Sequence, residues 1–236
     1  MAEPISTFKV GFEVANLSWE AFKAARNFIQ ALGKHPGHKA LSSLTTLEFT
    51  LEGNKQIAHY VQDRTFVFTQ NNQACPPFLH WTQGTHSIDE VNIDGIKKRY
   101  KVKEVPAGAK YILVDDDKVY SAGDRCRAVL IARSINGFNG EHEGFDIRMS
   151  EWYEALTFAI VFPPERIPKG PPELLYQSRK ESEKGVAGHW KPARRESHDF
   201  RRTTRERMMF VWETRHPRLG DSYSVRWTWE PWPARG

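Results

Sequence analysis

The sequence is poor in cysteine and has no long hydrophobic run, and each shortage argues against a class of protein. Two cysteines, Cys75 and Cys126, occur in 236 residues without a CxxC pair, which argues against a disulfide framework or a structural zinc site. We expect both thiols to be reduced and unpaired. No apolar run approaches the roughly 18 residues of a membrane-spanning helix, and residues 1–7 do not begin a signal peptide. We therefore expect a cytoplasmic protein without a membrane partner.

Motifs for catalysis and cofactor binding are also missing from the sequence. There is no HExxH zinc motif and no GxSxG nucleophile elbow, and the glycine-rich residues 136–144 match no phosphate-binding or calcium pattern. The adjacent carboxylates of residues 115–117 point in different directions in a turn, so we interpret them as a hairpin tip. We expect no cofactor and no metal; an enzyme is unsupported, and that question stays open. The best acid–base candidates are four residues around Trp81: His80, His86, Asp89 and Glu90.

Short strand patterns, in contrast, recur along most of the chain. Residues 47–51 alternate between apolar and polar side chains, as in a strand with one buried face. Asp94-Gly95 is the strongest hairpin signal in the sequence. One amphipathic helix is predicted over residues 18–33. The sequence thus predicts a mainly β protein, an antiparallel β-sandwich of packed sheets, one large or two small, with one N-terminal α-helix.

The C-terminal end has the clearest strand pattern, with four tryptophans in residues 208–232. Tyr223, Val225, Trp227 and Trp229 occupy every second position, and residues 209–212 form a second apolar run. We predict that these two strands form a β-hairpin whose aromatic face belongs to the core. Trp232 lies between two prolines and should fall outside the strand pairing.

Domain organisation is less clearly marked. We predict a helix-bearing β domain over residues 1–150 and a C-terminal β-sandwich block over residues 151–236, which ends in the Trp-rich hairpin. The proline run in residues 163–172 leaves no regular element there. The sequence leaves open whether the second block is a separate sandwich or the second sheet of a single domain.

Two basic groups stand out in a chain of net charge +5 and pI near 9.2. Lys97, Arg99, Lys101 and Lys103 alternate along one strand, where they would either track phosphates or protect an exposed edge from aggregation. Residues 191–207 contain seven basic and three acidic residues. Because this segment offers little apolar surface to a core, we expect it to be exposed and mobile.

A binding role explains these features best. Trp and Arg are the residue types richest in interface hot spots, so we predict a non-catalytic binding or scaffold domain that recognises a protein partner. The first alternative is a nucleic-acid-binding β protein that uses a basic strand face and an Arg-rich loop, and the second is a hydrolase with an unrecognised site. The partner would then be nucleic acid or another acidic molecule. The candidate binding residues are Lys97, Arg99, Lys101, Lys103, Arg194, Arg195, Arg201, Arg202 and Trp232.

Overall fold

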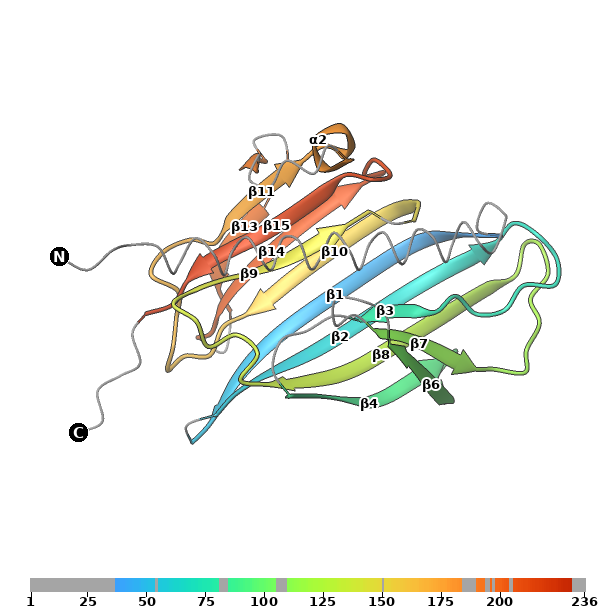
Figure 1. The fold of residues 1–236 in the computed structure, drawn as a ribbon, viewed down its shortest axis with the longest axis horizontal. Helices are drawn as coiled ribbons and strands as arrows, with labels where there is room; N and C mark the ends of the chain where they lie inside the picture. Colours follow the sequence, from blue (N-terminus) through green and yellow to red (C-terminus); the bar gives the residue numbers. More distant parts are fainter. Residues whose placement is uncertain are drawn as a thin grey trace.

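The computed structural model describes most of the chain beyond residue 36 and consists mainly of β-strands (Figure 1). The helix predicted over residues 18–33 lies outside the described residues. Within them, the single helix is the short α2 (Arg179–Glu183), and no helix is long and apolar enough to cross a membrane. The prediction of a mainly β protein is confirmed. The described residues are 37–53, 55–80, 85–104, 110–149, 151–183, 190–193, 196, 198–203 and 206–230.

The largest sheet has eight strands, and its centre joins distant parts of the chain. Strand β1 pairs with β10 in parallel and with β2 in antiparallel register, whereas the remaining neighbours in this sheet are antiparallel. Strands from both predicted domains, 1–150 and 151–236, therefore share one sheet. In spatial order it contains β13 (His198–Arg202), β14 (Met208–Arg215), β10 (Tyr153–Val161), β1 (His38–Glu52), β2 (Lys55–Phe68), β8 (Arg125–Ile135), β4 (Thr85–Ile93) and β5 (Ile96–Lys97).

Two smaller sheets contact one face of the eight-stranded sheet. The ring of Tyr60, on β2, has its centroid 5.0 Å from the ring of His80 and 6.1 Å from the ring of Phe145. His80 and Phe145 belong to different small sheets, so both sheets cover the same side of β2. The four-stranded sheet is β12 (Lys191–Pro192), β11 (Glu173–Gln177), β15 (Ser222–Thr228) and β9 (His142–Arg148), and the three-stranded sheet is β3 (Phe78–His80), β7 (Lys110–Asp115) and β6 (Arg99–Glu104).

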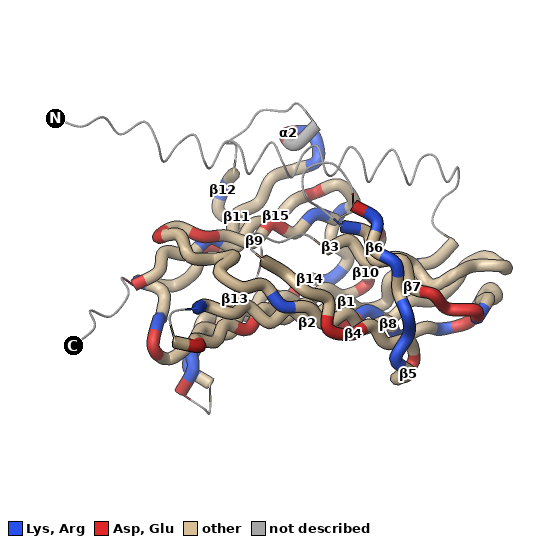
Figure 2. Tube along the Cα trace, turned by 60° about the horizontal axis from the view of Figure 1, so that its bottom comes forward, with Lys and Arg blue, Asp and Glu red and all other residues tan. Residues whose placement is uncertain are grey.

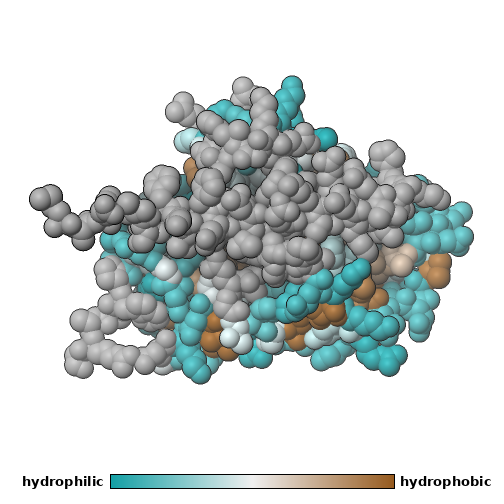
Figure 3. Space-filling model, viewed as in Figure 1, coloured by the Kyte–Doolittle hydropathy of each residue, from teal (hydrophilic) through white to brown (hydrophobic). Residues whose placement is uncertain are grey.

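Aromatic side chains fill the space between the four-stranded sheet and β1. Trp227 and Trp229 are 4% and 1% exposed, as the alternation in residues 223–229 predicted. The ring of Phe49, on β1, has its centroid 5.9 Å from that of Trp227 and 5.2 Å from that of Trp229. The prediction that these tryptophans belong to the core is confirmed. On the outer surface seen in Figure 3, exposed apolar residues form patches bordered by hydrophilic ones.

The predicted C-terminal hairpin is wrong, although both of its strands exist. β14 belongs to the eight-stranded sheet and β15 to the four-stranded sheet, so the turn at residues 216–221 connects two layers. Each strand buries an aromatic face against the other layer, and the rings of Trp212 and Tyr223 lie 4.5 Å apart. Positive φ angles at His216 (51°) and Gly220 (89°) allow the chain to reverse there. The two strands therefore pack face to face across the layers, and they do not pair edge to edge as a hairpin would.

The Asp94-Gly95 turn is confirmed, but its second arm is short. Asp94 and Gly95 have φ angles of 51° and 84°, the left-handed backbone that a tight hairpin turn requires. Only the two residues of β5 return along β4. After Lys98 the chain enters the three-stranded sheet as β6. The long basic strand expected from the sequence is therefore divided between two sheets.

The basic segment 191–207 has more structure than the sequence predicted. Its residues 198–202 form the edge strand β13, which pairs with β14. Phe200 packs against the core, with its ring centroid 6.2 Å from that of Phe162, and Arg207 binds the carboxylate of Glu48 and the carbonyl oxygen of Phe49. Backbone pairing and one aromatic ring offset the ordering entropy here, so the expectation that this segment has too little contact with the core to become ordered is wrong for residues 198–202.

Candidate functional site

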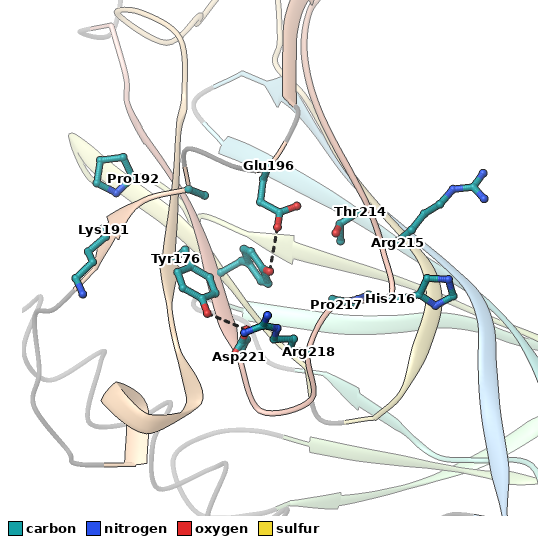
Figure 4. Close-up of a pocket in the computed structure, with 12 residues that line it drawn as sticks. Tyr176, Lys191, Pro192, Glu196, Thr214, Arg215, His216, Pro217, Arg218 and Asp221 are labelled. Atoms are coloured by element: carbon teal, nitrogen blue, oxygen red, sulfur yellow. Dashed lines mark hydrogen bonds between the residues drawn. The ribbon is translucent and has the colours of Figure 1, made fainter.

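A cavity of about 600 Å³ lies where β14 and β15 separate into different layers (Figure 4). Strands β11, β12, β14 and β15 and the turn at residues 216–221 contribute its walls. Because β14 does not pair with β15, their ends leave room for side chains of both layers around a shared space. The lining residues are Tyr176, Lys191, Pro192, Ala193, Glu196, Thr214, Arg215, His216, Pro217, Arg218, Asp221 and Tyr223.

Two tyrosines form an aromatic wall of the cavity. Tyr176 and Tyr223 are partners in the antiparallel register of β11 and β15, which places both side chains on the same face of the sheet. Their ring centroids lie 5.4 Å apart with a tilt of 53°. The ring of Trp212 packs against Tyr223 from the eight-stranded sheet. The wall is thus fixed by strand pairing on one side and by core packing on the other.

Each tyrosine donates a hydrogen bond to a carboxylate. Tyr176 Oη lies 2.9 Å from Asp221 Oδ2, and Tyr223 Oη lies 3.3 Å from Glu196 Oε1, as the dashed lines in Figure 4 show. Burial, followed by the hydrogen bond to Asp221, raises the pKa of Tyr176 to about 12. Burial and the charge of Glu196 also raise the pKa of Tyr223. Both phenols therefore remain protonated at neutral pH and act as donors.

The carboxylates of Asp221 and Glu196 differ in burial and in the lengths of the hydrogen bonds that they accept. Asp221 is 5% exposed and accepts hydrogen bonds from Tyr176 and from the backbone NH of Arg179, at 3.0 Å. Glu196 is half-buried and accepts from Trp212 Nε1 and Tyr223 Oη, both at 3.3 Å. These long bonds leave lone pairs of Glu196 available to a ligand.

Exposed cations surround the cavity. Arg218 lies beside Asp221, whereas Lys191 and Arg215 point away from the tyrosines in Figure 4. Lys191 Nζ forms a salt bridge of 2.5 Å with Glu181 Oε1. The ring of His216 lies 5.6 Å from the ring of Trp152, which is 41% exposed. The site combines aromatic rings, carboxylates and cations, which can together hold a polar chain with groups of both signs.

The binding residues predicted from the sequence that the structure describes lie outside this cavity. Figure 2 shows Lys and Arg running along β5 and β6, beside the acidic residues of β7 and the segment after it. The nearest ion-pair atoms of Lys97 and Glu90 are 3.7 Å apart, and those of Arg99 and Asp115 are also 3.7 Å apart. Six of the nine candidates lie within the described residues, and none of these six lines the cavity. They are Lys97, Arg99, Lys101 and Lys103 on β5 and β6, and Arg201 and Arg202 on β13. Arg194, Arg195 and Trp232 lie outside the described residues.

Of the suggested acid–base group, the two histidines lie side by side, but the two carboxylates pair with other residues. His80 is 4% exposed, its ring centroid lies 6.1 Å from that of His86, and burial lowers its pKa to about 4. Asp89 and Glu90 instead have cationic neighbours: Asp89 Oδ2 lies 2.7 Å from a guanidinium nitrogen of Arg133, and Glu90 pairs with Lys97. Trp81 lies outside the described residues.

In the run of carboxylates at residues 115–117, Asp115 and Asp116 also bind different partners. Asp115 pairs with Arg99, while Asp116 Oδ1 lies 2.8 Å from Lys98 Nζ. The Oη atom of Tyr120 donates to Asp116 at 3.1 Å. These contacts are those of a charged turn, and within the described chain no group of three or more ligand-type residues could hold a metal ion.

The sequence pattern does not mark the cavity residues Tyr176, Glu196 and Asp221. Tyr176 lies just after the proline run in residues 163–172, where no strand was expected, but β11 begins at Glu173. Glu196 lies within the basic segment, and its sequence neighbours suggest only a solvated loop. The cavity depends on contacts between β11, β14 and β15, and local periodicity carries no signal for such contacts.

Comparisons with known proteins do not assign a family. No family model and no curated protein matches the chain. Among solved structures, the chain is similar to an M1 zinc metallopeptidase from Deinococcus radiodurans (9% identity, TM-score 0.44, 80% of this chain and 42% of that one). It is also similar to leukotriene A4 hydrolase from Saccharomyces cerevisiae (9%, 0.41, 83% and 31%) and to a proposed nutrient binding protein from Legionella pneumophila (10%, 0.49, 83% and 68%). The chain thus spans less than half of the first of these structures, and similarities this remote support no functional argument.

Proposed function

We propose that this protein is a non-catalytic binding domain that recognises a short segment of a protein partner in the cavity lined by Tyr176, Glu196 and Tyr223. The cavity itself is the observation that carries the proposal: about 600 Å³ of space is lined by two tyrosines, two carboxylates and several cations. This volume falls within the range of ligand pockets, about 300–1,000 Å³. Tyrosine and arginine are also enriched at the energetic centres of protein interfaces.

The polarity of the cavity favours a peptide over a purely apolar ligand. Glu196 can accept a hydrogen bond from an amine or guanidinium of the partner, while Tyr176 and Tyr223 supply aromatic surface for its carbon chain. Arg218 can meet a partner carboxylate at the cavity edge. A ligand with groups of both signs uses all three features.

The test is binding of the full chain to an array of immobilised peptides of basic, acidic and mixed charge. The cavity variants Glu196→Gln and Arg218→Gln should weaken binding of the selected peptides at least about tenfold, the effect of losing one charge-assisted hydrogen bond. The matched controls Glu213→Gln and Arg201→Gln change exposed residues outside the cavity and should leave binding unchanged. Equal binding by all four variants would reject the cavity as the recognition site.

Nucleic-acid binding is the second proposal, and the cations along β5 and β6 support it (Figure 2). Phosphate contacts make affinity fall steeply with salt. Binding of a fluorescent single-stranded oligonucleotide should therefore weaken as salt rises, and Lys101→Gln with Lys103→Gln should reduce both affinity and the salt slope. Affinity that does not respond to salt would contradict this alternative. A hydrolase remains the third proposal, to be tested by thermal-shift screening with metals and nucleotides.

Two further proposals concern architecture and location. The contacts of both small sheets with one face of the eight-stranded sheet support a β-sandwich in which they form the second layer. The unpaired cysteines Cys75 and Cys126 support residence in the cytoplasm, where thiols are kept reduced. Labelling the protein in cell fractions tests the second of these.

A further inference from the structure

Two cysteines that are distant in sequence meet in the core. Cys75 lies in the connection between β2 and β3, and Cys126 lies on β8, 51 residues further along the chain. Their Sγ atoms are 3.9 Å apart, and both thiols are unpaired and buried. Cys126 is held there by strand pairing, as the register partner of Phe66 on β2.

The connection that carries Cys75 is fastened beside β8. Gln73 and Tyr120 form an isolated β-bridge, with backbone hydrogen bonds of 3.0 and 2.8 Å in the two directions. Residues 74–77 then form no regular element. A disulfide requires its sulfurs to be about 2.0 Å apart, so the two thiols must approach by about 2 Å. An irregular backbone on one side allows this movement while β8 stays in place.

We propose that Cys75 and Cys126 are an oxidation site, at which hydrogen peroxide forms a reversible disulfide that ties the β2–β3 connection to β8. The bond would join the segment leading into the three-stranded sheet to the centre of the eight-stranded sheet. Reversible bridges of this kind are the form in which cytosolic disulfides usually occur. The two thiols are thus a modification site separate from the proposed peptide cavity.

The reaction balances with peroxide as the oxidant. The Cys126 thiolate attacks one peroxide oxygen; the S–O bond forms, the O–O bond breaks, and the leaving hydroxide takes a proton to become water. The Cys75 sulfur then attacks the Cys126 sulfur as its proton is lost, the S–O bond breaks, and a second water leaves. In total, two thiols and one peroxide give one disulfide and two waters. A dithiol reductant reverses the change.

The surroundings favour Cys126 as the attacking sulfur. Its hydrogen bond with Cys75 lowers the pKa of Cys126 against the effect of burial, and Tyr120 lowers it further. The same bond and burial raise the pKa of Cys75, which keeps its proton until the second step. Cys75 is 9% exposed and Cys126 1%, so the proposed reaction requires the backbone around Cys75 to move before peroxide can reach Cys126.

The experiment treats the folded full chain with hydrogen peroxide, alkylates the remaining thiols and measures mass before and after digestion. We expect the intact protein to lose two hydrogen atoms, neither thiol to be alkylated, and one digestion product to link Cys75 with Cys126. Dithiothreitol should restore both thiols. The oxidised protein should melt at a higher temperature, because the bridge restricts the unfolded chain.

Two controls separate the bridge from other oxidation. In Cys75→Ala the remaining thiol should stop at a sulfenic acid that dimedone traps, and in Cys126→Ala no bridge should form. If either variant fails to fold, the wild-type masses still decide the question. Added oxygen without loss of two hydrogens, a bridge between two chains, or a bridge that appears only in urea would each overturn the proposal.

Discussion

Replacing Glu151 with glutamine should lower the free energy of unfolding by about 3 kcal/mol at neutral pH. The Glu151 carboxylate accepts hydrogen bonds from three residues of the eight-stranded sheet: Arg64 Nη1 at 3.1 Å, Tyr153 Oη at 2.8 Å and His38 Nε2 at 3.2 Å. Arg64 is 4% exposed and also donates to the carbonyl oxygen of Pro77 at 2.9 Å. Removing the carboxylate leaves a buried guanidinium without its counter-charge, a change that typically costs about 3–5 kcal/mol.

The pKa of Glu151 gives a second, independent magnitude for the contribution of this carboxylate to the free energy of unfolding. Burial alone would raise it, but the hydrogen bond from His38 and the charge of Arg64 outweigh burial and lower it from 4.5 to about 2. Each pH unit between folded and unfolded pKa values corresponds to about 1.4 kcal/mol, so this difference corresponds to about 3 kcal/mol. Because the folded pKa is the lower one, the contribution is complete above about pH 4.5 and is lost as the pH falls through 2.

Urea unfolding of wild type and Glu151→Gln at neutral pH and near pH 3 measures both effects. The difference in unfolding free energy should be largest at neutral pH and smaller near pH 3. Glu154→Gln, an exposed residue three positions further along the chain on β10, is the matched control and should stay within about 0.5 kcal/mol of wild type. The double variant Arg64→Met with Glu151→Leu should cost less than the sum of its single changes. A loss below about 1 kcal/mol for Glu151→Gln, with an unchanged urea dependence, would refute the reasoning.

Two further changes test the four-stranded sheet. Trp227→Ala should lower the unfolding free energy by about 3–5 kcal/mol, because the ring packs between Phe49 and Phe162 in the core; an unchanged denaturant midpoint would contradict this. Burial raises the pKa of Glu143 to about 7, although a hydrogen bond from the Gly140 NH acts in the opposite direction. Because the folded pKa is the higher one, the folded state loses stability as the pH rises from about 4.5 through 7. Glu143→Gln should therefore be more stable than wild type at pH 8 and equal to it below pH 4.5, and the reverse order in thermal melts would show that the charge is stabilising.

Burial along single strands could be predicted from the sequence. Period-2 alternation follows from strand geometry, in which successive side chains point to opposite faces. In residues 223–229 it correctly placed Tyr223, Val225, Trp227 and Trp229 inside. On β8, Cys126 and Ala128 occupy alternate positions and are likewise buried. The Asp94-Gly95 turn was also readable, because both residue types tolerate the positive φ angles found there.

Pairing between strands could not be predicted in the same way. Two apolar runs joined by a short turn are compatible with a hairpin and with a crossing between layers, and residues 208–229 form the crossing. The parallel pairing of β1 with β10 joins residues more than a hundred positions apart, so no local pattern indicates it. The candidate site shares this limit, because Tyr176 and Tyr223 meet through sheet pairing and Glu196 meets Tyr223 only after the layers are assembled.

The crossing at residues 216–221 both creates the cavity and separates the roles of its two carboxylates. A hairpin between β14 and β15 would have paired their edges and left no space between Thr214 and Tyr223. The turn is anchored at Met149, whose carbonyl accepts from the Gly220 NH at 2.8 Å and whose NH donates to the Asp221 carbonyl at 2.9 Å. The buried Asp221 side chain strengthens this anchor through Tyr176 and Arg179, so it maintains the cavity. Glu196 is half-buried and held by longer bonds, so under the proposed function it is the carboxylate that would determine which ligand the cavity accepts.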